Sequence, residues 1–357
     1  MESMRILHCS AALDDESGCF VNLGDEGLSR EIQAELRRAM PEHVVTRAIQ
    51  GRSSTRVGEP TIDARPFRFL LAQALNCDAI VIGGGTLFQH SAGLMRWQVL
   101  LALVGRIQRK PVCISHIGAE GLRGWSAGVA RFLVSSASSV TVRDEYTAEH
   151  LRSIGCGPVV LAADAMFLSD YEAPAAAERT GVAINLKPGA LPTESLRSLA
   201  DAVVSVTQPN EPVVLIPFDR RPEMDSSTLR EFDEFLANRR RVVWVGPGEQ
   251  VDSVLSILSG VRISIGVRLH FSIFSSIAGA SLVSLGMEPK ARSFAQSVKA
   301  VEIDPVEMRS DKVAAQLREA RPITDAARVD LRRMADAGLS EVVDVLRFAA
   351  ENGAVRR

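Results

Sequence analysis

Short apolar runs alternate with amphipathic stretches along almost the whole chain, and this alternation is what most constrains the fold. CDAIVIGGG, PVCISHIG and SSVTVRD read as strands, whereas LSREIQAELRRAM has apolar residues four apart, the spacing of an amphipathic helix. The alternation restarts near residue 180, from GVAINLK to SLVSLG. It predicts an α/β protein with two Rossmann-like, doubly wound domains that face each other across a cleft.

The length and one atypical stretch suggest where the domains meet. A chain of 357 residues exceeds what one hydrophobic core usually serves. The stretch SDYEAPAAAERT, residues 169–180, is rich in Ala, Pro and Glu, lacks a clear period and reads as a linker. We therefore expect an N-terminal domain over 1–172, a C-terminal domain over 180–310 and a charged helical tail over 311–357.

Composition narrows the class of protein. Apolar residues make up 46% and charged residues 24%, as in ordinary globular proteins, and the net charge of −2 gives no support for a nucleic-acid partner. Five scattered cysteines without paired spacing predict buried thiols rather than a zinc site or a disulfide framework. The N-terminus does not resemble a signal peptide, and no apolar run approaches the roughly 20 residues of a membrane span. We expect a cytoplasmic protein, at the inner face of the membrane if its substrate is lipid-linked.

The first candidate motif is NLGDEGL, directly before the first predicted helix. Gly24 lies between Asn22 and Asp25, so backbone amides and the helix N-terminus could face an anion or a sugar. On this interpretation Asn22 and Asp25 bind substrate. The alternative is simple helix capping, because Asp25 and Glu26 favour the positive end of a helix without any ligand.

The second candidate motif is IVIGGGTLF, where three glycines follow an apolar strand. Gly83, Gly84 and Gly85 would let the backbone approach a substrate closely. The spacing is neither GxGxxG, since Phe88 takes the place of the third glycine, nor a Walker loop, which weakens nicotinamide and ATP hypotheses. The alternative is a tight turn from strand to helix.

Two further candidates follow predicted strands. Arg143 ends the SSVTVRD strand and could bind an anion in the cleft through its two-pronged guanidinium. The alternatives are a surface pair with Asp144, or Asp144 acting as a helix cap. Asp164 in AADAMFL could hold a sugar hydroxyl or orient Arg143, and otherwise it is an ordinary loop aspartate.

The strongest candidate is SIGVRLHF, in which a fixed cation and an imidazole sit in an apolar run. Burying the charge of Arg268 is costly without a partner, so we expect a small, multiply charged anion to provide it. Arg268 and His270 would lie at a strand-to-helix junction, where helix amides also attract anions. Lys290, beyond the next strand, is a candidate second cation, with an exposed lysine as the alternative. The other histidines show no ligand spacing, and we treat most of them as incidental; they are His8, His43, His90, His116 and His150.

Taken together, these motifs resemble the polysaccharide pyruvyl transferase family. The resemblance rests on NLGDEGL, VIGGGTLF, SVTVRDEYTAEHLRSIG, AADAMFL, SIGVRLHFSIFSSIAGASLV and PKARSF, which occur in the family's order. It implies a fold similar to the two-domain GT-B glycosyltransferases. It also implies transfer of a pyruvyl group from phosphoenolpyruvate to a sugar diol, which forms a cyclic ketal on a glycan or on its lipid-linked precursor.

The resemblance also implies residue roles. Arg268 would bind the donor, His270 would be the acid/base, Arg143 would be a second anion ligand, and Lys290 would be a weaker candidate for the phosphate. The expected partners are phosphoenolpyruvate and a sugar, oligosaccharide or lipid-linked acceptor, without metal or cofactor, and membrane contact would be peripheral.

Two other functions stay open at this point. A GT-B glycosyltransferase would use a nucleotide sugar, with Glu249 of PGEQVD on the ribose, although no diagnostic spacing supports this. A non-catalytic family member would bind a glycan without turnover.

Overall fold

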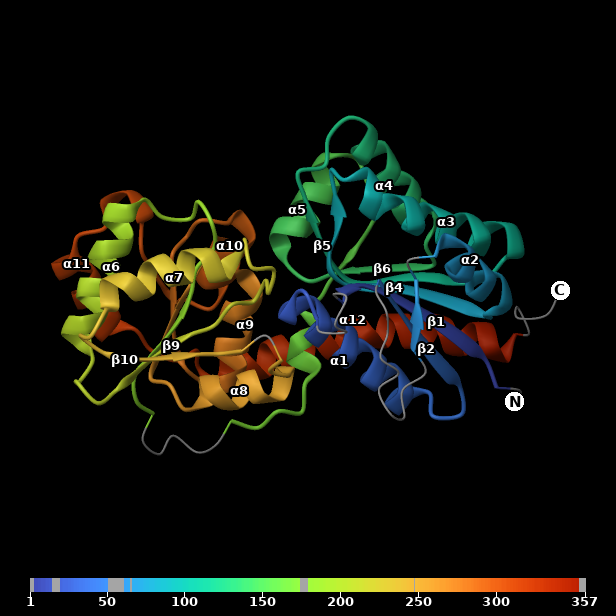
Figure 1. Ribbon diagram of the computed structural model, residues 1–357. Coiled ribbons are helices and arrows are strands. Elements are labelled where there is room, and N and C mark those ends of the chain that lie inside the picture. Colours follow the sequence, from blue (N-terminus) through green and yellow to red (C-terminus); the bar gives the residue numbers. More distant parts are fainter. Residues whose placement is uncertain are drawn as a thin grey trace. The chain divides into compact units, whose positions relative to one another are not determined.

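The computed structural model describes residues 3–14, 20–50, 61–64, 66–173, 179–246 and 248–352, with only the backbone for Leu94 and Glu307. The described residues form two compact units, each built on its own parallel sheet (Figure 1). The first unit comprises Met1–Phe20, Asp25–Ser169 and Asp330–Arg357, and the second comprises Val21–Gly24 and Asp170–Val329.

The sheet of the first unit has the strand order β3-β2-β1-β4-β5-β6-β7, and all its described pairs are parallel. Its strands are β1 (Arg5–Leu13), β2 (Val44–Gln50), β3 (Thr61–Asp63), β4 (Ala79–Gln89), β5 (Val112–Glu120), β6 (Ser139–Val142) and β7 (Val160–Leu161). The order reverses between β1 and β4, as in Rossmann sheets.

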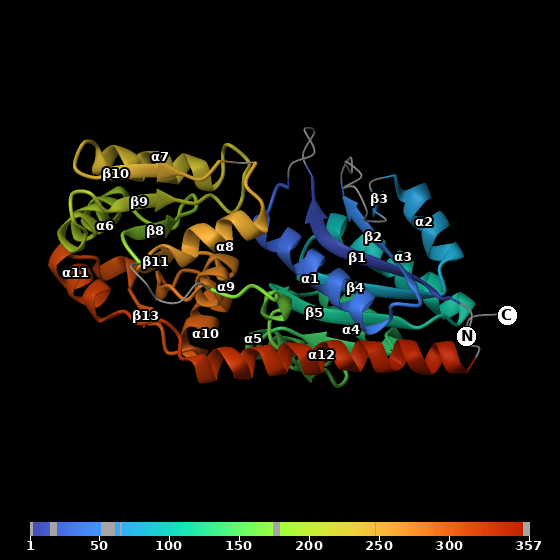
Figure 2. The ribbon, with the colours of Figure 1, turned by 90° about the horizontal axis from the view of Figure 1, so that it is seen from below.

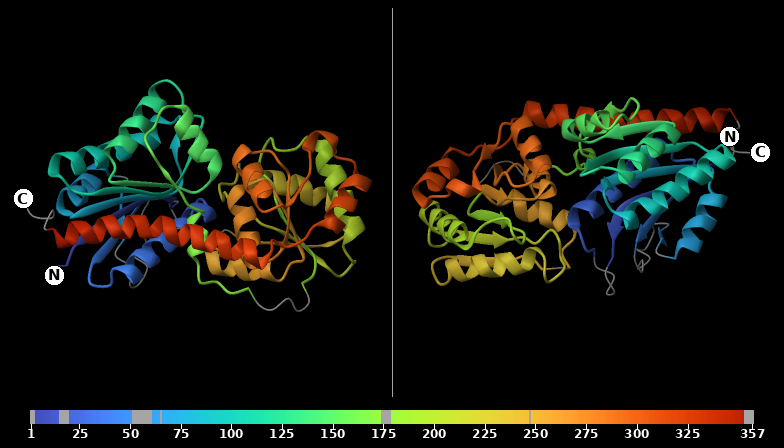
Figure 3. Two further views of the ribbon diagram at one scale, coloured as in Figure 1. Left: turned by 180° about the vertical axis from the view of Figure 1, so that it is seen from behind. Right: turned by 90° about the horizontal axis from the view of Figure 1, so that it is seen from above.

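Helices cover both faces of this sheet, with α2, α3 and α4 on one face and α1 and α12 on the other (Figure 1). The part of α12 that belongs to this unit runs along the strands (Figure 3). The helices are α1 (Leu23–Ala39), α2 (Phe67–Asn76), α3 (Ala92–Gln108), α4 (Trp125–Ser136), α5 (Glu145–Ser153), the short η1 (Ala165–Leu168) and α12 (Asp325–Glu351).

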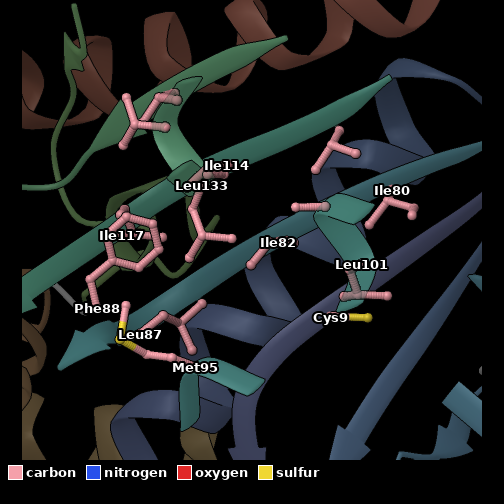
Figure 4. Close-up of a cluster of buried hydrophobic side chains, with 14 of the residues drawn as sticks. Cys9, Ile80, Ile82, Leu87, Phe88, Met95, Leu101, Ile114, Ile117 and Leu133 are labelled. Atoms are coloured by element: carbon pink, nitrogen blue, oxygen red, sulfur yellow. The ribbon is translucent and has the colours of Figure 1, made fainter. Parts of the chain in front are cut away.

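The core of the first unit lies between the central strands and the helices packed on them (Figure 4). Ile80 and Ile82 of β4 meet Ile114 of β5 and Leu101 of α3, and all four are buried. Strands covered on both faces need apolar residues on both, which explains why these strands read as continuous apolar runs.

The sheet of the second unit has the order β10-β9-β8-β11-β12-β13, again parallel, with the reversal between β8 and β11. Its strands are β8 (Val182–Asn185), β9 (Pro212–Leu215), β10 (Arg241–Trp244), β11 (Ile263–Gly266), β12 (Ser281–Ser284) and β13 (Val301–Glu302).

Figure 2 shows α6 and α11 on one side of these strands and α8, α9 and α10 on the other. The helices are α6 (Thr193–Val206), α7 (Asp225–Leu236), α8 (Val251–Ser259), α9 (Leu269–Ala278), α10 (Pro289–Ser297), the short η2 (Pro305–Glu307) and α11 (Ser310–Glu319). α9 is almost wholly apolar because it is buried; its three serines donate to carbonyl oxygens one turn earlier.

The predicted α/β class and the two parallel Rossmann-like sheets are confirmed. The expected tail is divided, because α11 belongs to the second unit whereas α12 joins the first from Asp330 onward. Of the expected linker, residues 174–178 lie outside the described part. No helix in the described ranges is long and apolar enough to cross a membrane.

The cysteines follow the expectation of thiols without disulfides as far as they are described. Cys9, Cys77 and Cys113 are buried and Cys156 is half-buried, all as free thiols, whereas Cys19 lies outside the described residues. Burial raises the pKa of Cys113 to about 11, so this thiol stays protonated and unreactive near neutral pH.

Candidate functional site

The RLH stretch lies where the strand order of the second sheet reverses. β11 pairs with β8 and β12, and Gly266 at its end stands opposite Asn185. Arg268 is the N-cap of α9, and His270 lies in the first turn of that helix. The predicted strand-to-helix junction is therefore confirmed, and it occupies the position where doubly wound sheets bind ligands.

Arg268 is paired with a carboxylate of the protein itself. Its Nε donates to Oδ1 and Oδ2 of Asp225 at 2.9 and 2.8 Å, and its Nη2 also donates to Oδ1. Oδ2 of Asp219 lies 3.7 Å from Nη2. The expectation that a substrate anion supplies the partner of Arg268 is thus corrected, because a cation that is largely desolvated in the free protein needs a permanent partner.

Asp225 accepts hydrogen bonds from donors on three sides. It is fully buried, and its Oδ2 accepts from the backbone N–H groups of Phe218 and Asp219 at 2.9 and 3.1 Å. The side-chain amide of Asn185 donates to the same oxygen at 3.1 Å. These contacts hold the carboxyl group in place, so Asp225 fixes the guanidinium of Arg268 in one orientation.

Asp225 contacts only one edge of the Arg268 guanidinium. Only Nε and Nη2 bind Asp225, and Nη1 makes no hydrogen bond to any residue that the structure describes. The side chain is 17% exposed. Burial alone lowers the pKa of Arg268, but the hydrogen bonds and charge of Asp225 outweigh burial and raise it, so the guanidinium stays charged and can donate to an anion.

Glu288 links two lysines to the surroundings of Arg268. Lys187 donates to Oε1 of Glu288, and Nζ of Lys290 lies 3.6 Å from its Oε2. Burial raises the pKa of Glu288, but the charges of Lys290, Lys187 and Arg268 outweigh it and lower the pKa below its ordinary value. Lys290 is only 19% exposed and is not the exposed surface lysine of the alternative interpretation.

The first motif meets the RLH stretch within the second unit. The backbone N–H of Leu23 donates to the carbonyl of Phe218 at 3.0 Å, and Asn22 forms an antiparallel bridge with Asp219. A methyl group on Gly24 would fall 2.0 Å from Nδ1 of His270, so the absence of a side chain at residue 24 is what lets the imidazole pack there.

Asn22 acts as a cap in this structure. Its Oδ1 accepts from the backbone N–H of Gly24 at 3.0 Å, just as α1 begins, which is the capping role that the alternative interpretation gave to this motif. A role of Asn22 in substrate binding stays a prediction.

The three glycines of the second motif allow close packing inside the first unit. They lie within β4 rather than in a turn, so the expected tight turn is wrong; β4 continues to Gln89 with a register shift after Gly85. A Cβ added to Gly83 would fall 2.7 Å from the carbonyl oxygen of Ser115. A Cβ added to Gly85 would fall 2.7 Å from Oδ1 of Asp25.

Gly84 has a φ of +82°, and an added Cβ there would lie 3.2 Å from Cβ of Leu28 on α1. The groups that approach these glycines closely belong to the protein, chiefly to α1 and β5. Substrate binding by Asp25 and the three glycines stays a prediction.

Each of the three guanidinium nitrogens of Arg143 lies near an oxygen atom of the protein. Nε donates to Asp144 at 3.0 Å, Nη2 donates to the hydroxyl of Thr86 at 2.9 Å, and Nη1 lies 3.8 Å from Oδ2 of Asp164. The side chain is 2% exposed, so its pair with Asp144 is buried rather than on the surface. Its role as a second anion ligand stays a prediction.

Two carboxylates surround this arginine. Asp144 caps α5 by accepting from the backbone N–H of Thr147 at 2.7 Å, which confirms the capping alternative. Burial raises the pKa of Asp164 to about 6, against the lowering effect of Arg143 and of a hydrogen bond from the Met166 backbone. The position of Asp164 agrees with orienting Arg143, and sugar binding by it stays a prediction.

Sequence reasoning missed Asp225, Glu288 and Lys187. An acidic residue in the first turn of α7 gives only a capping signal, and a carboxylate that pairs across 43 residues leaves no local pattern. Glu249 of the alternative nucleotide-sugar hypothesis offers its backbone carbonyl to Arg220, and Pro247 beside it is outside the described residues. No group of three potential ligands in the described ranges could hold a metal ion.

The fold is shared with solved nucleotide-sugar enzymes. A putative UDP-N-acetylglucosamine 2-epimerase from Listeria monocytogenes matches with a TM-score of 0.63 at 10% identity, over 98% of this chain and 97% of that one. Anabaena HepE, solved with UDP and glucose, matches with a TM-score of 0.60 at 13% identity, over 96% and 99%. At these identities the likeness shows the fold alone, which is α/β and GT-B-like with two Rossmann-like domains.

Sequence comparison gives the family. No curated protein matches this chain in sequence. The family model for polysaccharide pyruvyl transferase, however, matches residues 22–288, which run from the Asn22 motif through the RLH stretch to Glu288. That match covers well over half of the chain, and the protein belongs to the polysaccharide pyruvyl transferase family.

Proposed function

We propose that the protein transfers the pyruvyl group of phosphoenolpyruvate to a sugar diol of a glycan or glycan precursor, where it forms a pyruvate ketal. The observation that carries this proposal is the position of Arg268 and His270 at the strand-order reversal of the second unit, inside the family match. A lipid-linked acceptor would bring the enzyme to the inner face of the membrane.

The charges around Arg268 suit a donor with a carboxylate and a phosphate. The cations Arg268, Lys187 and Lys290 lie around Glu288, as its lowered pKa reflects. Nη1 of Arg268 is the donor that an incoming carboxylate or phosphate oxygen can accept from, while Asp225 keeps the guanidinium plane fixed. We assign donor binding to Arg268, with Lys290 as a second contact for the phosphate.

The reaction needs protons to move in both directions. One sugar hydroxyl adds to C2 of phosphoenolpyruvate and loses its proton, while C3 gains a proton and becomes a methyl group. The second hydroxyl then attacks C2 and the C2–O bond to phosphate breaks. The proton of this hydroxyl leaves with inorganic phosphate as the ketal ring closes. We assign the proton transfer to His270, because imidazole both accepts and donates protons near neutral pH.

The test is ligand-dependent thermal unfolding of the wild-type protein, with phosphoenolpyruvate and separately with UDP-glucose and UDP-N-acetylglucosamine. A ligand at about 100 times its Kd adds about 2.7 kcal/mol to the free energy of unfolding. We expect phosphoenolpyruvate to raise the unfolding temperature, and to release inorganic phosphate once an acceptor is supplied. A rise with the nucleotide sugars alone would instead identify a GT-B glycosyltransferase, and donor binding without turnover on any acceptor would identify a non-catalytic member.

A further inference from the structure

Two aromatic rings stand together at the carboxyl edge of the first sheet, outside the residues assigned above. β4 ends at Gln89 and β5 at Glu120, and these residues stand opposite each other in register. His90 follows β4, and Trp125 begins α4. The ring centroids of His90 and Trp125 are 5.0 Å apart at an angle of 42°. Trp125 is 47% exposed, at the edge of the sheet where ligands bind.

The imidazole of His90 is fixed by a buried hydroxyl. Nδ1 lies 2.8 Å from Oγ of Ser126, whose side chain also accepts from the backbone N–H of Arg123 and donates to its carbonyl, at 3.0 and 2.9 Å. With the hydroxyl proton of Ser126 directed to the Arg123 carbonyl, the network is completed by the tautomer in which Nδ1–H of His90 donates to Oγ. In this tautomer Nε2 carries a lone pair, and it makes no hydrogen bond within the described ranges.

The indole of Trp125 is also uncommitted. Its Nε1–H makes no hydrogen bond to the residues that the structure describes, although nearly half of the side chain is exposed. Trp244 in the second unit differs, because its indole N–H has a hydrogen-bond acceptor in the protein. It is 38% exposed, but its Nε1 donates to Asp233 at 2.8 Å, and no ring pair is found for it in the described part. Trp125 therefore offers an aromatic face, a donor and a neighbouring acceptor together.

These groups match the surface of a pyranose. The axial C–H groups of a sugar ring form an apolar face that stacks on an indole, and its hydroxyls donate and accept at the rim. We propose that Trp125 and His90 form a sugar-binding subsite, in which the ring stacks on Trp125 and one hydroxyl donates to Nε2 of His90. Its identification as the acceptor subsite rests on the proposed function.

The subsite and Arg143 share the carboxyl edge of the first sheet. Thr86, which accepts from Arg143, precedes His90 by one short stretch of β4, and the side chain of Gln89 donates to the carbonyl of Thr86 at 2.7 Å. The end of β4, which contacts Arg143 through Thr86, therefore also carries His90. A sugar on Trp125 would lie at the same edge of this sheet.

The experiment is saturation-transfer NMR and calorimetry without phosphoenolpyruvate. The probes are the methyl pyranosides of glucose, galactose and N-acetylmannosamine, each with a free 4,6-diol. We expect at least one to bind wild type, with transfer strongest at one face of the ring. Trp125→Ala should weaken binding about tenfold, and His90→Ala by a smaller factor. Trp244→Ala is the matched control and should bind as wild type does. An unchanged unfolding temperature shows that the exposed Trp125 variant is folded.

Two outcomes would overturn the proposal: equal affinity of wild type and Trp125→Ala, or no binding of any probe to wild type. The acceptor role is tested separately with turnover, where Trp125→Ala should raise the KM for the acceptor and leave the KM for phosphoenolpyruvate unchanged. If sugar binding depends on Trp125 but phosphoenolpyruvate is not used, the proposed function fails and the sugar subsite stands. If turnover occurs and Trp125→Ala leaves the acceptor KM unchanged, the acceptor role of the subsite fails alone.

Discussion

The two units carry an arginine after a strand of similarly ordered parallel sheets, yet they treat it differently. Arg143 in the first unit is 2% exposed, and each of its guanidinium nitrogens faces a protein group. Arg268 in the second unit is 17% exposed and binds Asp225 along one edge only. The described contacts of Arg143 thus tie it to the ends of β4 and β6, whereas Arg268 keeps one donor edge without a hydrogen bond to the described residues.

The carboxylates beside the two arginines differ as well. Asp225 accepts hydrogen bonds from two backbone N–H groups and the Asn185 amide. Asp164 has one backbone donor, and burial raises its pKa to about 6. The first unit therefore contains a carboxyl group that titrates just below neutral pH.

The largest expected effect is a loss of kcat on replacing His270, the imidazole two residues after Arg268. His270→Gln keeps the volume against Gly24 but cannot carry a proton, so we expect kcat to fall about 10²- to 10⁴-fold. The measurement is phosphate release from phosphoenolpyruvate. His150→Gln is the matched control, since His150 accepts a backbone N–H of Leu122 and a glutamine oxygen can replace it. Near-wild-type kcat in His270→Gln would contradict the proton-transfer role.

The permanent pair of the second unit should matter strongly for stability. Asp225→Ala leaves the charge of Arg268 and two backbone N–H groups without their acceptor, so we expect the free energy of unfolding to fall by about 3–5 kcal/mol. Urea unfolding measures this change. Asp201→Ala, which breaks the exposed pair with Arg239, is the control and should cost less than about 1 kcal/mol. If the two variants lost the same free energy of unfolding, the buried pair of Asp225 would stabilise the protein no more than an exposed pair does.

The titrating carboxyl of the first unit should give stability a pH dependence. The pKa of Asp164 rises from 3.8 to about 6 on folding, so between these pH values the folded protein keeps a proton that the unfolded chain has lost. This contribution to stability is present below pH 3.8 and is lost as the pH rises to about 6, by about 3 kcal/mol in total. Asp164→Asn keeps the cap acceptor and should lack this loss. If wild type and Asp164→Asn gave parallel pH profiles of unfolding free energy, the raised pKa of Asp164 would be contradicted.

The smallest expected effect is a loss of kcat on replacing Gly24, which lies where the first motif contacts the RLH stretch. Gly24→Ala places a methyl group 2.0 Å from Nδ1 of His270, so the ring must move. We expect kcat to fall about tenfold, because small displacements of a reacting group are costly. Gly128→Ala in α4 meets nothing within 4 Å and should leave kcat unchanged. Full activity in Gly24→Ala would show that the position of His270 is not critical.

Local patterns predicted the elements with the clearest periodicity. The apolar strands β4, β5, β11 and β12 and the position of RLH at a strand-to-helix junction followed from apolar runs and their ends. Three helices, α2, α4 and α10, were not anticipated. β4 was expected to stop at its glycines, but α1 and β5 pack closely against them and the strand continues.

Partners distant in the sequence could not be predicted. The rule that a buried cation needs a counter-charge correctly indicated that Arg268 has a partner, but not whether protein or ligand supplies it. Asp225 lies 43 residues earlier, and only the fold brings it to Arg268. Similarly, His90 was set aside as incidental because its significance comes from Trp125 and Ser126, which approach it only after β4 and β5 pair.

The central claim is that the free edge of Arg268 binds the carboxylate or phosphate of phosphoenolpyruvate. Calorimetric titration of phosphoenolpyruvate into wild type, Arg268→Lys and Arg239→Lys tests it most directly. A lysine has a single point charge and cannot both hold Asp225 and offer a fixed donor edge. We predict that Arg268→Lys weakens binding roughly 10- to 100-fold, whereas Arg239→Lys, at an exposed ion pair, binds like wild type. Equal affinity of Arg268→Lys and wild type would contradict the claim.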